Sequence, residues 1–369
     1  MVLSWLAANP RADRRRSYGA EQRAVIDPDR VPDVGKLLGD THGPTPLHDL
    51  PALAAHFGLG AIRAKDESQR FGFGAFKALG GVFAVHDYLA THKDLKAADI
   101  VFTTASSGNH GRSVALGAQS VGARCTIFLP KFTSAEKDAA IRAKGAEVIR
   151  IDGDYDTAVA ECRRQAEARG WTIVSDTSWP GYEAIPRAVM RGYTMLAREI
   201  VRQWPPTPAQ APTHVLVQAG VGGLAAAVIG YLWAVLPQRP VFVIVEPRSA
   251  DCWFQSNKAG KPALASGNAD TAMGGLACRA ISPVTWPVIA EGADWFMTIE
   301  EDEVMPARRL FAHPVGGDPA IASGPSGCAG LAGLTRLCGD DHARRQLGLD
   351  GSARVLLINS EGNLGEGTA

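Results

Sequence analysis

The sequence has few cysteines, and they form no cluster. Its 6 cysteines are scattered over 369 residues, with no C-x-x-C pair and no group of cysteines and histidines. This pattern fits neither a disulfide framework nor a zinc site. We therefore expect no bound metal and a reducing, cytoplasmic environment.

An excess of charge of one sign is also missing. Lysine plus arginine and aspartate plus glutamate number 38 each, so the formal net charge is zero. A chain without a positive field attracts a polyanion or an acidic membrane only through a local patch. The dense basic run, Arg14 to Arg16, lies near the N-terminus, where a solvated segment is the commoner case. We expect no nucleic-acid partner.

Long apolar runs are absent as well. The longest, Leu224 to Leu236, is shorter than the ~20 residues of a membrane helix and predicts a buried helix instead. The N-terminal apolar stretch precedes its basic residues, which is the wrong order for a secretory signal. We therefore expect no membrane partner.

What the sequence does contain is an alternation of short β-branched runs with longer amphipathic stretches. Strand patterns lie at 99–105, 125–130, 147–152 and 171–177, and helical patterns lie at 110–122, 135–145 and 156–170. A second series has strand patterns at 214–220 and 241–247, with a helix from Gly222 to Leu236 between them. This alternation predicts an α/β fold with parallel strands, and ligands bound at the carboxyl ends of those strands.

A proline-rich segment, WPPTPAQAPTH at 204–214, separates the two series. It is too polar and too interrupted by proline to form a regular element. The segment is either a domain junction or a surface loop within one domain.

Lys77 lies in an otherwise uncharged segment between Arg70 and Asp87. Burial of a lysine disfavours its ammonium form and lowers its pKa, which prepares the amine to attack a carbonyl carbon and form a Schiff base. The same spacing also suits a lysine that extends from the edge of an amphipathic helix.

Two turns follow predicted strands and open predicted helices. In the Ser-Ser-Gly-Asn-His-Gly turn at 106–111, backbone N–H groups and two hydroxyls converge, as in a carboxylate or phosphate site. Ser106, Ser107 and Asn109 are also ordinary N-cap residues. In the loop from Gly220 to Leu224, glycines let the N–H groups point at a phosphate.

The second turn has a rival interpretation. Its letters match G-x-G-x-x-A, and Glu246 ends the next predicted strand, as in a dinucleotide-binding fingerprint. A candidate Schiff-base lysine earlier in the chain favours a cofactor with a single phosphate.

Two more polar residues lie at the carboxyl ends of predicted strands. Asp176 lies at the end of one strand pattern, where an open α/β sheet places its reactive groups, although it could also cap the next segment. Ser360 follows the C-terminal strand and can donate a hydrogen bond to a ring nitrogen.

Together these segments resemble the fold type II, or β-family, pyridoxal-phosphate enzymes, which include threonine dehydratase, serine racemase and the tryptophan synthase β-chain. The motifs that carry the resemblance are KDESQRFGFGAFKALGG, SDTSWPGYEAIP with MRGY, VQAGVGGLAA, VEPRSADC, GGLAC and SGPSG, within a span from GPTPLHDL to SEGN. Within this family they are similar to the diaminopropionate ammonia-lyases. The resemblance implies two open twisted α/β domains with the cofactor in the cleft between them. We expect a large cofactor-binding domain of residues 1–80 and 205–369 and a small domain of residues 81–204.

The resemblance also implies roles for individual residues. Lys77 would form the Schiff base with pyridoxal 5'-phosphate, and Ser360 would face its pyridine nitrogen. Phe76 would contact the cofactor, and Asn109 would bind its phenolic oxygen. The phosphate would be held by Gly220, Val221, Gly222, Gly223 and Leu224. The substrate would meet Thr45, Ser106, Ser107 and His110.

The implied reaction is an α,β-elimination of 2,3-diaminopropionate, with the L-form preferred, to pyruvate and ammonia. Asp176 matches the acidic residue that deprotonates L-substrates in the lyases. Lys77 is the competing base, and otherwise it would protonate the leaving group. A hydroxyl at the ring nitrogen leaves that nitrogen largely unprotonated, which suits a β-elimination.

Ser107 departs from the lyase pattern. The lyases carry aspartate in a T-D-G-N-H-G loop as the base for the D-enantiomer, and serine is a poor base. We therefore expect weak activity on the D-form or none. The loop looks like that of serine racemase and threonine dehydratase, so two alternatives stay open. One is a dehydratase of serine, threonine or hydroxyaspartate, and the other is a racemase that uses Lys77 and Ser107. An inert cofactor-binding protein and an oxidoreductase are less favoured.

Two further expectations follow from the resemblance. Cys252 and Cys278 match cysteines of the lyases and are expected either to approach each other or to be buried free thiols. Relatives of this fold are commonly dimers, so we expect a homodimer that acts on a small amino acid.

Overall fold

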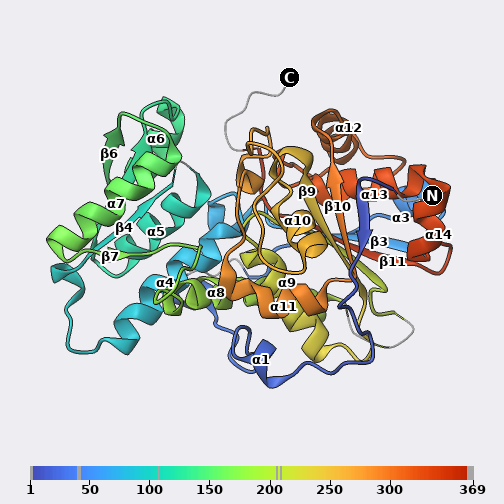
Figure 1. The fold of residues 1–369 in the computed structure, drawn as a ribbon, viewed down its shortest axis with the longest axis horizontal. Coiled ribbons are helices and arrows are strands. Elements are labelled where there is room, and N and C mark those ends of the chain that lie inside the picture. Colours follow the sequence, from blue (N-terminus) through green and yellow to red (C-terminus); the bar gives the residue numbers. More distant parts are fainter. Residues whose placement is uncertain (1–2, 40–42, 107, 205–206, 208–209, 364–369) are drawn as a thin grey trace. The chain divides into compact units, whose positions relative to one another are not determined.

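The computed structural model describes residues 3–39, 43–106, 108–204, 207 and 210–363. The chain folds into two compact units, which are described one at a time (Figure 1). The first comprises Met1–Arg30, Pro44–Ala75 and Leu196–Ala369, and the second comprises Val31–Gly43 and Phe76–Met195. The divisions thus fall at 30/31, 43/44, 75/76 and 195/196, against the expected 80/81 and 204/205.

The first unit contains a seven-stranded sheet with the order β1-β10-β9-β8-β11-β3-β2. Its strands are β1 (Leu6–Ala8), β2 (Leu47–Asp49), β3 (Ala61–Asp66), β8 (His214–Gln218), β9 (Val241–Pro247), β10 (Trp295–Ile299) and β11 (Arg354–Asn359). The five inner strands run parallel, whereas β1 and β2 pair antiparallel at the two edges. Short edge strands of this kind limit pairing with other chains.

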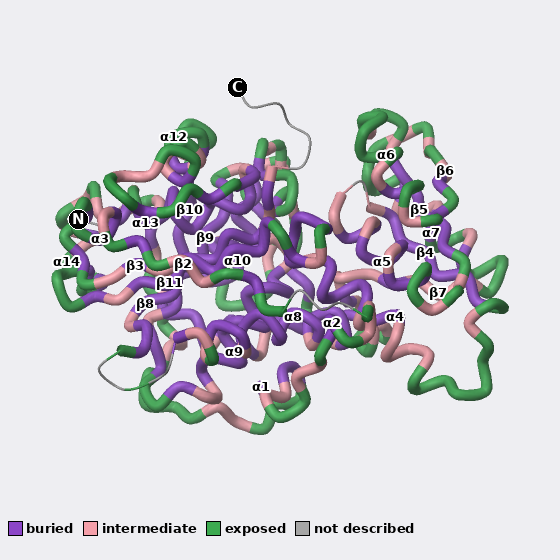
Figure 2. The backbone as a smooth tube through the Cα atoms, turned by 180° about the vertical axis from the view of Figure 1, so that it is seen from behind, coloured by how far each residue is buried: buried purple, intermediate pink, exposed green. Residues whose placement is uncertain are grey.

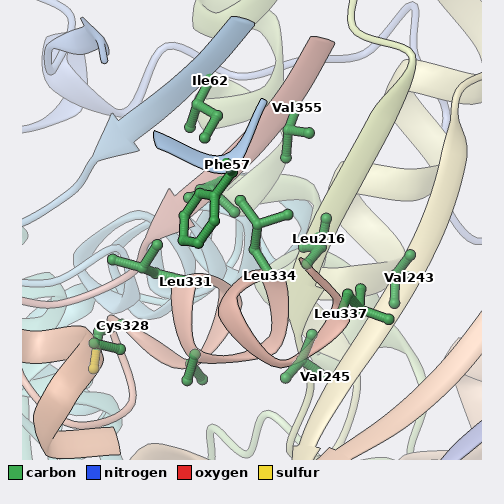
Figure 3. Packing of buried hydrophobic residues seen from close by; sticks show 14 of the residues in the cluster. Phe57, Ile62, Leu216, Val243, Val245, Cys328, Leu331, Leu334, Leu337 and Val355 are labelled. Carbon is green, nitrogen blue, oxygen red and sulfur yellow. The ribbon is translucent and has the colours of Figure 1, made fainter. Parts of the chain in front are cut away.

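Four helices supply the main core on one face of this sheet. They are α3 (Pro51–Phe57), α12 (Glu301–Ala312), α13 (Ala329–Gly339) and α14 (Asp341–Leu347). Figure 3 shows Leu331 and Leu334 of α13 beside Phe57 and the strand residues Leu216 and Val355. Because side chains alternate along a strand, the buried neighbours of these strand residues point to the opposite face, so this inner part of the sheet is buried on both faces.

The predicted buried helix is α9 (Gly223–Val235), which packs against β8. All residues from Gly223 to Trp233 are buried, and α9 is coloured as buried in Figure 2. The unit also contains α1 (Ala20–Arg23), α10 (Cys252–Ala259) and α11 (Trp286–Gly292). Within the described residues, no helix combines the length and the apolar character that crossing a membrane requires.

The second unit contains a parallel four-stranded sheet with the order β6-β5-β4-β7. The strands are β4 (Val101–Ala105), β5 (Arg124–Pro130), β6 (Glu147–Ile151) and β7 (Thr172–Ile173), and the helices are α2 (Val34–Leu37), α4 (Lys77–Thr91), α5 (Asn109–Ser120), α6 (Ala135–Arg142) and α7 (Tyr155–Arg169). A last helix, α8 (Ala184–Gln203), contributes residues to both units. Short 3₁₀ turns lie at Arg70–Gly72, Ala97–Asp99, Arg248–Ala250, Gly274–Leu276 and Pro283–Thr285.

The predicted α/β fold class is confirmed, and the alternation of strands and helices follows the sequence pattern closely. The main difference is β7, which is much shorter than the strand expected at 171–177. The hydroxyl of Tyr182 donates to the Ile173 carbonyl at 2.7 Å and accepts from the Ser175 N–H at 2.9 Å. A side chain therefore takes the backbone partners that a longer strand would use, and the chain bends just before Asp176.

Candidate functional site

Lys77 and Asp176 form a close pair in the second unit. Lys77 is the first residue of α4, and Asp176 lies in the bend after β7. Nζ of Lys77 donates to Oδ2 of Asp176 at 2.5 Å, and each side chain is 19% exposed. The two sequence candidates for Schiff-base formation and proton transfer are thus brought together.

Asp176 is held in its ionised form. Burial raises the pKa of its carboxyl group, but the charge of Lys77, together with a contribution from His110, lowers that pKa by more. The result is a pKa below the usual value of 3.8. At neutral pH the side chain is therefore a carboxylate, which can accept a proton.

His110 lies on the first turn of α5, beside this pair. Its Nε2–H donates to the carbonyl of Val174 at 2.8 Å, because a carbonyl can only accept. Burial lowers the pKa of His110, as does the charge of Lys77, while Asp176 opposes them. The ring is therefore neutral at pH 7, and its buried Nδ1, 3.9 Å from Oδ2 of Asp176, has no hydrogen-bond partner within the described ranges.

Two aromatic rings line the Lys77 amine. Its Nζ lies 5.5 Å from the ring centre of Phe76 and 5.9 Å from that of Tyr193, and the two ring centres are 4.7 Å apart. Burial raises the pKa of the Tyr193 hydroxyl, so that it is neutral. Phe76 was a sequence candidate, whereas Tyr193 was not, although it ends the MRGY motif.

Small residues make this arrangement possible. A Cβ on Gly192 would lie 2.3 Å from the Leu79 carbonyl oxygen, and one on Gly80 would lie 2.4 Å from the Tyr193 ring. Glycine at both positions therefore allows the start of α4 to lie against this part of α8. Close packing therefore explains why glycine occurs at these positions of the KALGG and MRGY motifs.

The turn after β4 is stabilised by Ser106. Its Oγ accepts the N–H groups of Gly108 at 3.3 Å and Gly111 at 3.1 Å, which is a capping role. Oδ1 of Asn109 accepts from Nη1 of Arg112 at 3.1 Å. Ser107 lies outside the described residues.

The glycine loop of the first unit has a shape that only glycine permits. Gly222 has a φ of +103°, and a Cβ there would lie 2.6 Å from the Trp253 ring. The first hydrogen bond at the start of α9 runs from the Ala226 N–H to the Gly222 carbonyl at 2.8 Å. The N–H groups of Gly223 and Leu224 precede this bond, and such groups are the ones that hold a phosphate at a helix start.

Glu246 does not fit the dinucleotide interpretation of this loop. Its buried carboxyl group accepts the N–H groups of Trp253 at 2.8 Å and Phe254 at 2.7 Å, and so caps α10. Burial raises its pKa well above the usual value, while these N–H groups oppose the rise. Both carboxyl oxygens are engaged within the protein, whereas a ribose hydroxyl would need one of them.

Ser360 follows β11 and is 3% exposed. Its Oγ accepts a hydrogen bond from Nε2 of Gln218, at the end of β8, at 2.9 Å. Gln218 was not a sequence candidate, because a single glutamine at a strand end carries no recognisable pattern.

Thr45 belongs to a buried network of charged residues. Its Oγ1 donates to Glu67 at 2.6 Å and accepts from Arg70 at 2.9 Å. Arg70 also binds Glu199 at 2.7 Å, and Lys65 binds Glu199 at 2.6 Å. The network balances two positive and two negative charges, and it engages the hydroxyl that we expected at the substrate. The substrate role of Thr45 stays a prediction.

Cys252 and Cys278 are not joined in a disulfide, and both lie next to Gly220. Sγ of Cys252 is 3.7 Å from the Gly220 carbonyl oxygen, and a Cβ on Gly220 would lie 2.9 Å from Sγ of Cys278. Burial raises the pKa of Cys252. In the part of the chain that the structure describes, no group of three or more His, Cys, Asp or Glu side chains could hold a metal ion.

Comparisons with known proteins show the family of the chain. Residues 38–361 match a family described as pyridoxal-phosphate dependent enzyme. The chain is 39% identical over 343 residues to the diaminopropionate ammonia-lyase of Salmonella typhimurium, which covers 86% of this chain and 85% of that protein.

Two solved structures share the fold. Diaminopropionate ammonia-lyase from Escherichia coli, in complex with an aminoacrylate-PLP azomethine reaction intermediate, has a TM-score of 0.86 at 36% identity, over 99% of this chain and 96% of that chain. Threonine deaminase isoform 2 from Solanum lycopersicum, in its processed form, has a TM-score of 0.75 at 22% identity, over 98% of this chain and 89% of that chain. The second match concerns the fold alone.

Proposed function

Because the chain belongs to the family of pyridoxal-phosphate dependent enzymes, we propose that it is an ammonia-lyase that eliminates ammonia from 2,3-diaminopropionate. With one water consumed, the products are pyruvate and two molecules of ammonia. The observation that carries the proposal is the 2.5 Å contact between the Lys77 amine and the Asp176 carboxylate. An elimination of this kind needs an amine that binds the cofactor and a group that moves a proton.

The residues present fit pyridoxal 5'-phosphate. Lys77 supplies the amine, and the N–H groups from Val221 to Leu224, with glycines where a Cβ would clash, suit its phosphate. Asn109 would bind the phenolic oxygen, Phe76 would contact the ring, and Ser360 would face the pyridine nitrogen. When bound, the cofactor supplies an electron-withdrawing ring that stabilises negative charge on the α-carbon of an amino acid.

The proton movements can be assigned to two atoms. Oδ2 of Asp176 accepts the α-proton of the substrate, since the carboxylate is ionised at neutral pH. Once the substrate amine has replaced Lys77 on the cofactor, Nζ of Lys77 would donate a proton to the departing β-amine, and it would receive that proton from Asp176, which has taken it from the α-carbon. Lys77 is also the competing base for the α-proton. The neutral His110 beside Asp176 keeps the carboxylate in a buried, partly desolvated setting.

We further propose that the L-form is preferred. Asp176 matches the lyase residue for L-substrates. At the position where the lyases carry an aspartate for the D-form, the sequence has Ser107, whose hydroxyl is a poor base.

The same Ser107 supports a second candidate function. The Ser-Ser-Gly-Asn-His-Gly sequence is similar to the loop of serine racemase and threonine dehydratase. On this alternative, the leaving group is a hydroxyl of serine, threonine or 3-hydroxyaspartate, and Lys77 with Ser107 carries the proton transfers. A racemase would use the same two residues on opposite faces of the α-carbon.

A substrate panel distinguishes these functions. The cofactor-loaded protein is assayed for keto-acid release from L- and D-2,3-diaminopropionate, L- and D-serine, L-threonine and threo-3-hydroxyaspartate, and for inversion of serine. We expect the highest kcat/KM for L-2,3-diaminopropionate. A higher value for a hydroxy amino acid would replace the lyase by a dehydratase, and inversion without keto acid would replace it by a racemase.

The proposal for assembly and location rests on the sequence and the family. We propose a homodimer that acts on a small amino acid in the cytoplasm. Light scattering of the purified holoenzyme measures the mass, and a monomer would contradict the dimer.

A further inference from the structure

We propose that Gln218 is a positioning residue that orients the Ser360 hydroxyl so that its proton points at the cofactor, which keeps the pyridine nitrogen unprotonated. The inference rests on the proposed function, because it assumes that Ser360 faces this nitrogen. Both residues belong to the first unit, Gln218 at the end of β8 and Ser360 just after β11. These two strands are neighbours in the sheet.

The orientation of the Gln218 amide is determined by its surroundings. Nε2 lies 3.1 Å from the Ser326 carbonyl oxygen, 3.0 Å from that of Ile358 and 3.4 Å from that of Gly327. Carbonyl oxygens accept hydrogen bonds and cannot donate them, so the NH₂ end of the amide must face this group. Oε1 is buried on the other side, without a partner among the described residues.

Because the NH₂ end faces this group, Gln218 is a donor to Ser360. Nε2 and Oγ are 2.9 Å apart, so one lone pair of the Ser360 hydroxyl is occupied. Within the described residues the side chain of Ser360 makes no other hydrogen bond, and it is 3% exposed. A buried hydroxyl proton without an acceptor is unfavourable, so the proton is directed to an acceptor on the bound molecule. A pyridine nitrogen accepts this proton only in its unprotonated form.

Removal of the Gln218 amide would change which form of the pyridine nitrogen Ser360 favours. The carbonyl oxygens of Ser326 and Ile358 would lose their donor and become acceptors for the Ser360 proton. Oγ would then present a lone pair to the ring, which favours a protonated nitrogen. We therefore expect the apparent pKa of the ring nitrogen to rise by about one unit, the size expected when one hydrogen bond is lost.

The test observes the nitrogen directly. Holoenzyme loaded with pyridoxal phosphate labelled with ¹⁵N in the ring is titrated from pH 6 to pH 9 and followed by solid-state ¹⁵N NMR. Wild type should give the unprotonated signal at neutral pH and above, with its midpoint near the acid limit of the titration. Gln218→Met should raise that midpoint by about one pH unit, which brings a clear pyridinium signal into the measured range. Gln238→Met, which changes an exposed glutamine of the same unit, should match wild type.

A second variant keeps the proposal testable if Gln218→Met does not fold. Gln218→Asn keeps a buried amide but is one methylene shorter, so its NH₂ group should reach neither Ser360 nor both of the carbonyl oxygens, and it should also raise the midpoint. A pyridinium signal in the wild type at neutral pH would overturn the proposal. An unchanged midpoint in a Gln218 variant that folds would also overturn the proposal, provided that Ser360→Ala shifts the midpoint.

Failure of the underlying function has a different signature. If the protein binds no cofactor or releases no keto acid, the proposed function fails before any NMR spectrum is recorded. If cofactor and activity are present but Ser360→Ala leaves the ¹⁵N signal unchanged, the inference alone fails.

Discussion

The amine of Lys77 and the carboxylate of Asp176 meet at 2.5 Å although the residues are 99 positions apart in the chain. One begins a helix and the other follows a strand of the same unit. A single proton can therefore pass between two groups that the sequence presents separately.

Replacement of Asp176 tests its role as the base. Asp176→Asn removes the proton acceptor but keeps the shape, so kcat/KM for L-2,3-diaminopropionate should fall by about 10²–10⁴-fold, the usual contribution of a general base. Absorbance of the bound cofactor should persist. Asp152→Asn, whose carboxylate is 83% exposed and pairs with Lys131, is the matched control. A loss of less than tenfold would assign the α-proton to Lys77.

Gly192→Ala tests the packing that holds Lys77. A Cβ there would lie 2.3 Å from the backbone oxygen of Leu79, two residues after Lys77, so the start of α4 must move. We expect a loss of about 1–3 kcal/mol of unfolding free energy, as for other overpacked sites, together with weaker cofactor binding. Both are measured by denaturant titration and by equilibrium dialysis. Gly339→Ala, where a Cβ meets nothing within 4 Å, should change neither.

Arg70→Met tests the buried charge network. Arg70 is fully buried and binds both Glu67 and Glu199. Burial lowers its pKa, but the two carboxylates raise it by more, so the guanidinium stays charged. Its removal leaves buried carboxylates uncompensated and should cost about 3–5 kcal/mol.

The control for this variant is a surface pair. Arg164→Met breaks the contact of Arg164 with Glu161, where the arginine is 67% exposed, and should cost about 1 kcal/mol or less. Equal losses for the two variants in urea titrations would contradict a special role of the network.

Buried histidines should make stability depend on pH. Burial lowers the pKa of His214, and the charge of Arg14 adds to this effect, while a hydrogen bond to the Leu347 carbonyl opposes it. The native state therefore binds fewer protons than the unfolded state at pH values below the usual 6.5. Stability rises with pH in this window and falls on acidification, by up to about 1.4 kcal/mol per pH unit for each such residue.

The free energy of unfolding is measured by urea titration at about pH 7.5, 6.5 and 5.5. His214→Gln should reduce the slope, whereas His313→Gln, which changes an exposed histidine, should leave it unchanged. A slope that is the same in all three proteins would show that folding does not lower the pKa of His214.

Much of the fold can be predicted because the hydrophobic patterns that indicate strands and helices lie within short segments of the sequence. The strand pattern at 125–130 reflects burial on both faces, the helix pattern at 156–170 reflects burial of one face, and both elements occur as expected. Asp176 also lies just after a parallel strand, where an open α/β sheet places its reactive groups, and its role stays a prediction. The strand at 171–177 was predicted too long, because Tyr182 lies farther along the chain and takes its hydrogen bonds.

The parts that sequence reasoning missed depend on contacts between distant positions. Tyr193 reaches the Lys77 amine only because Gly80 and Gly192 allow two helices to lie close together. Lys65 and Arg70 are charged and therefore suggest exposure, yet both are fully buried because Glu67 and Glu199 neutralise them. No local pattern reports such compensation.

Helix α9 is buried from Gly223 to Trp233, and this has a consequence for the loop that precedes it. The aligned peptide dipoles of a helix give its first turn a partial positive charge. Around an exposed helix, water of high permittivity weakens that field, whereas the apolar surroundings of α9 have a low permittivity. Dissolved ions cannot reach the helix to screen it either. The attraction of this helix end for a doubly charged phosphate should therefore persist at high salt.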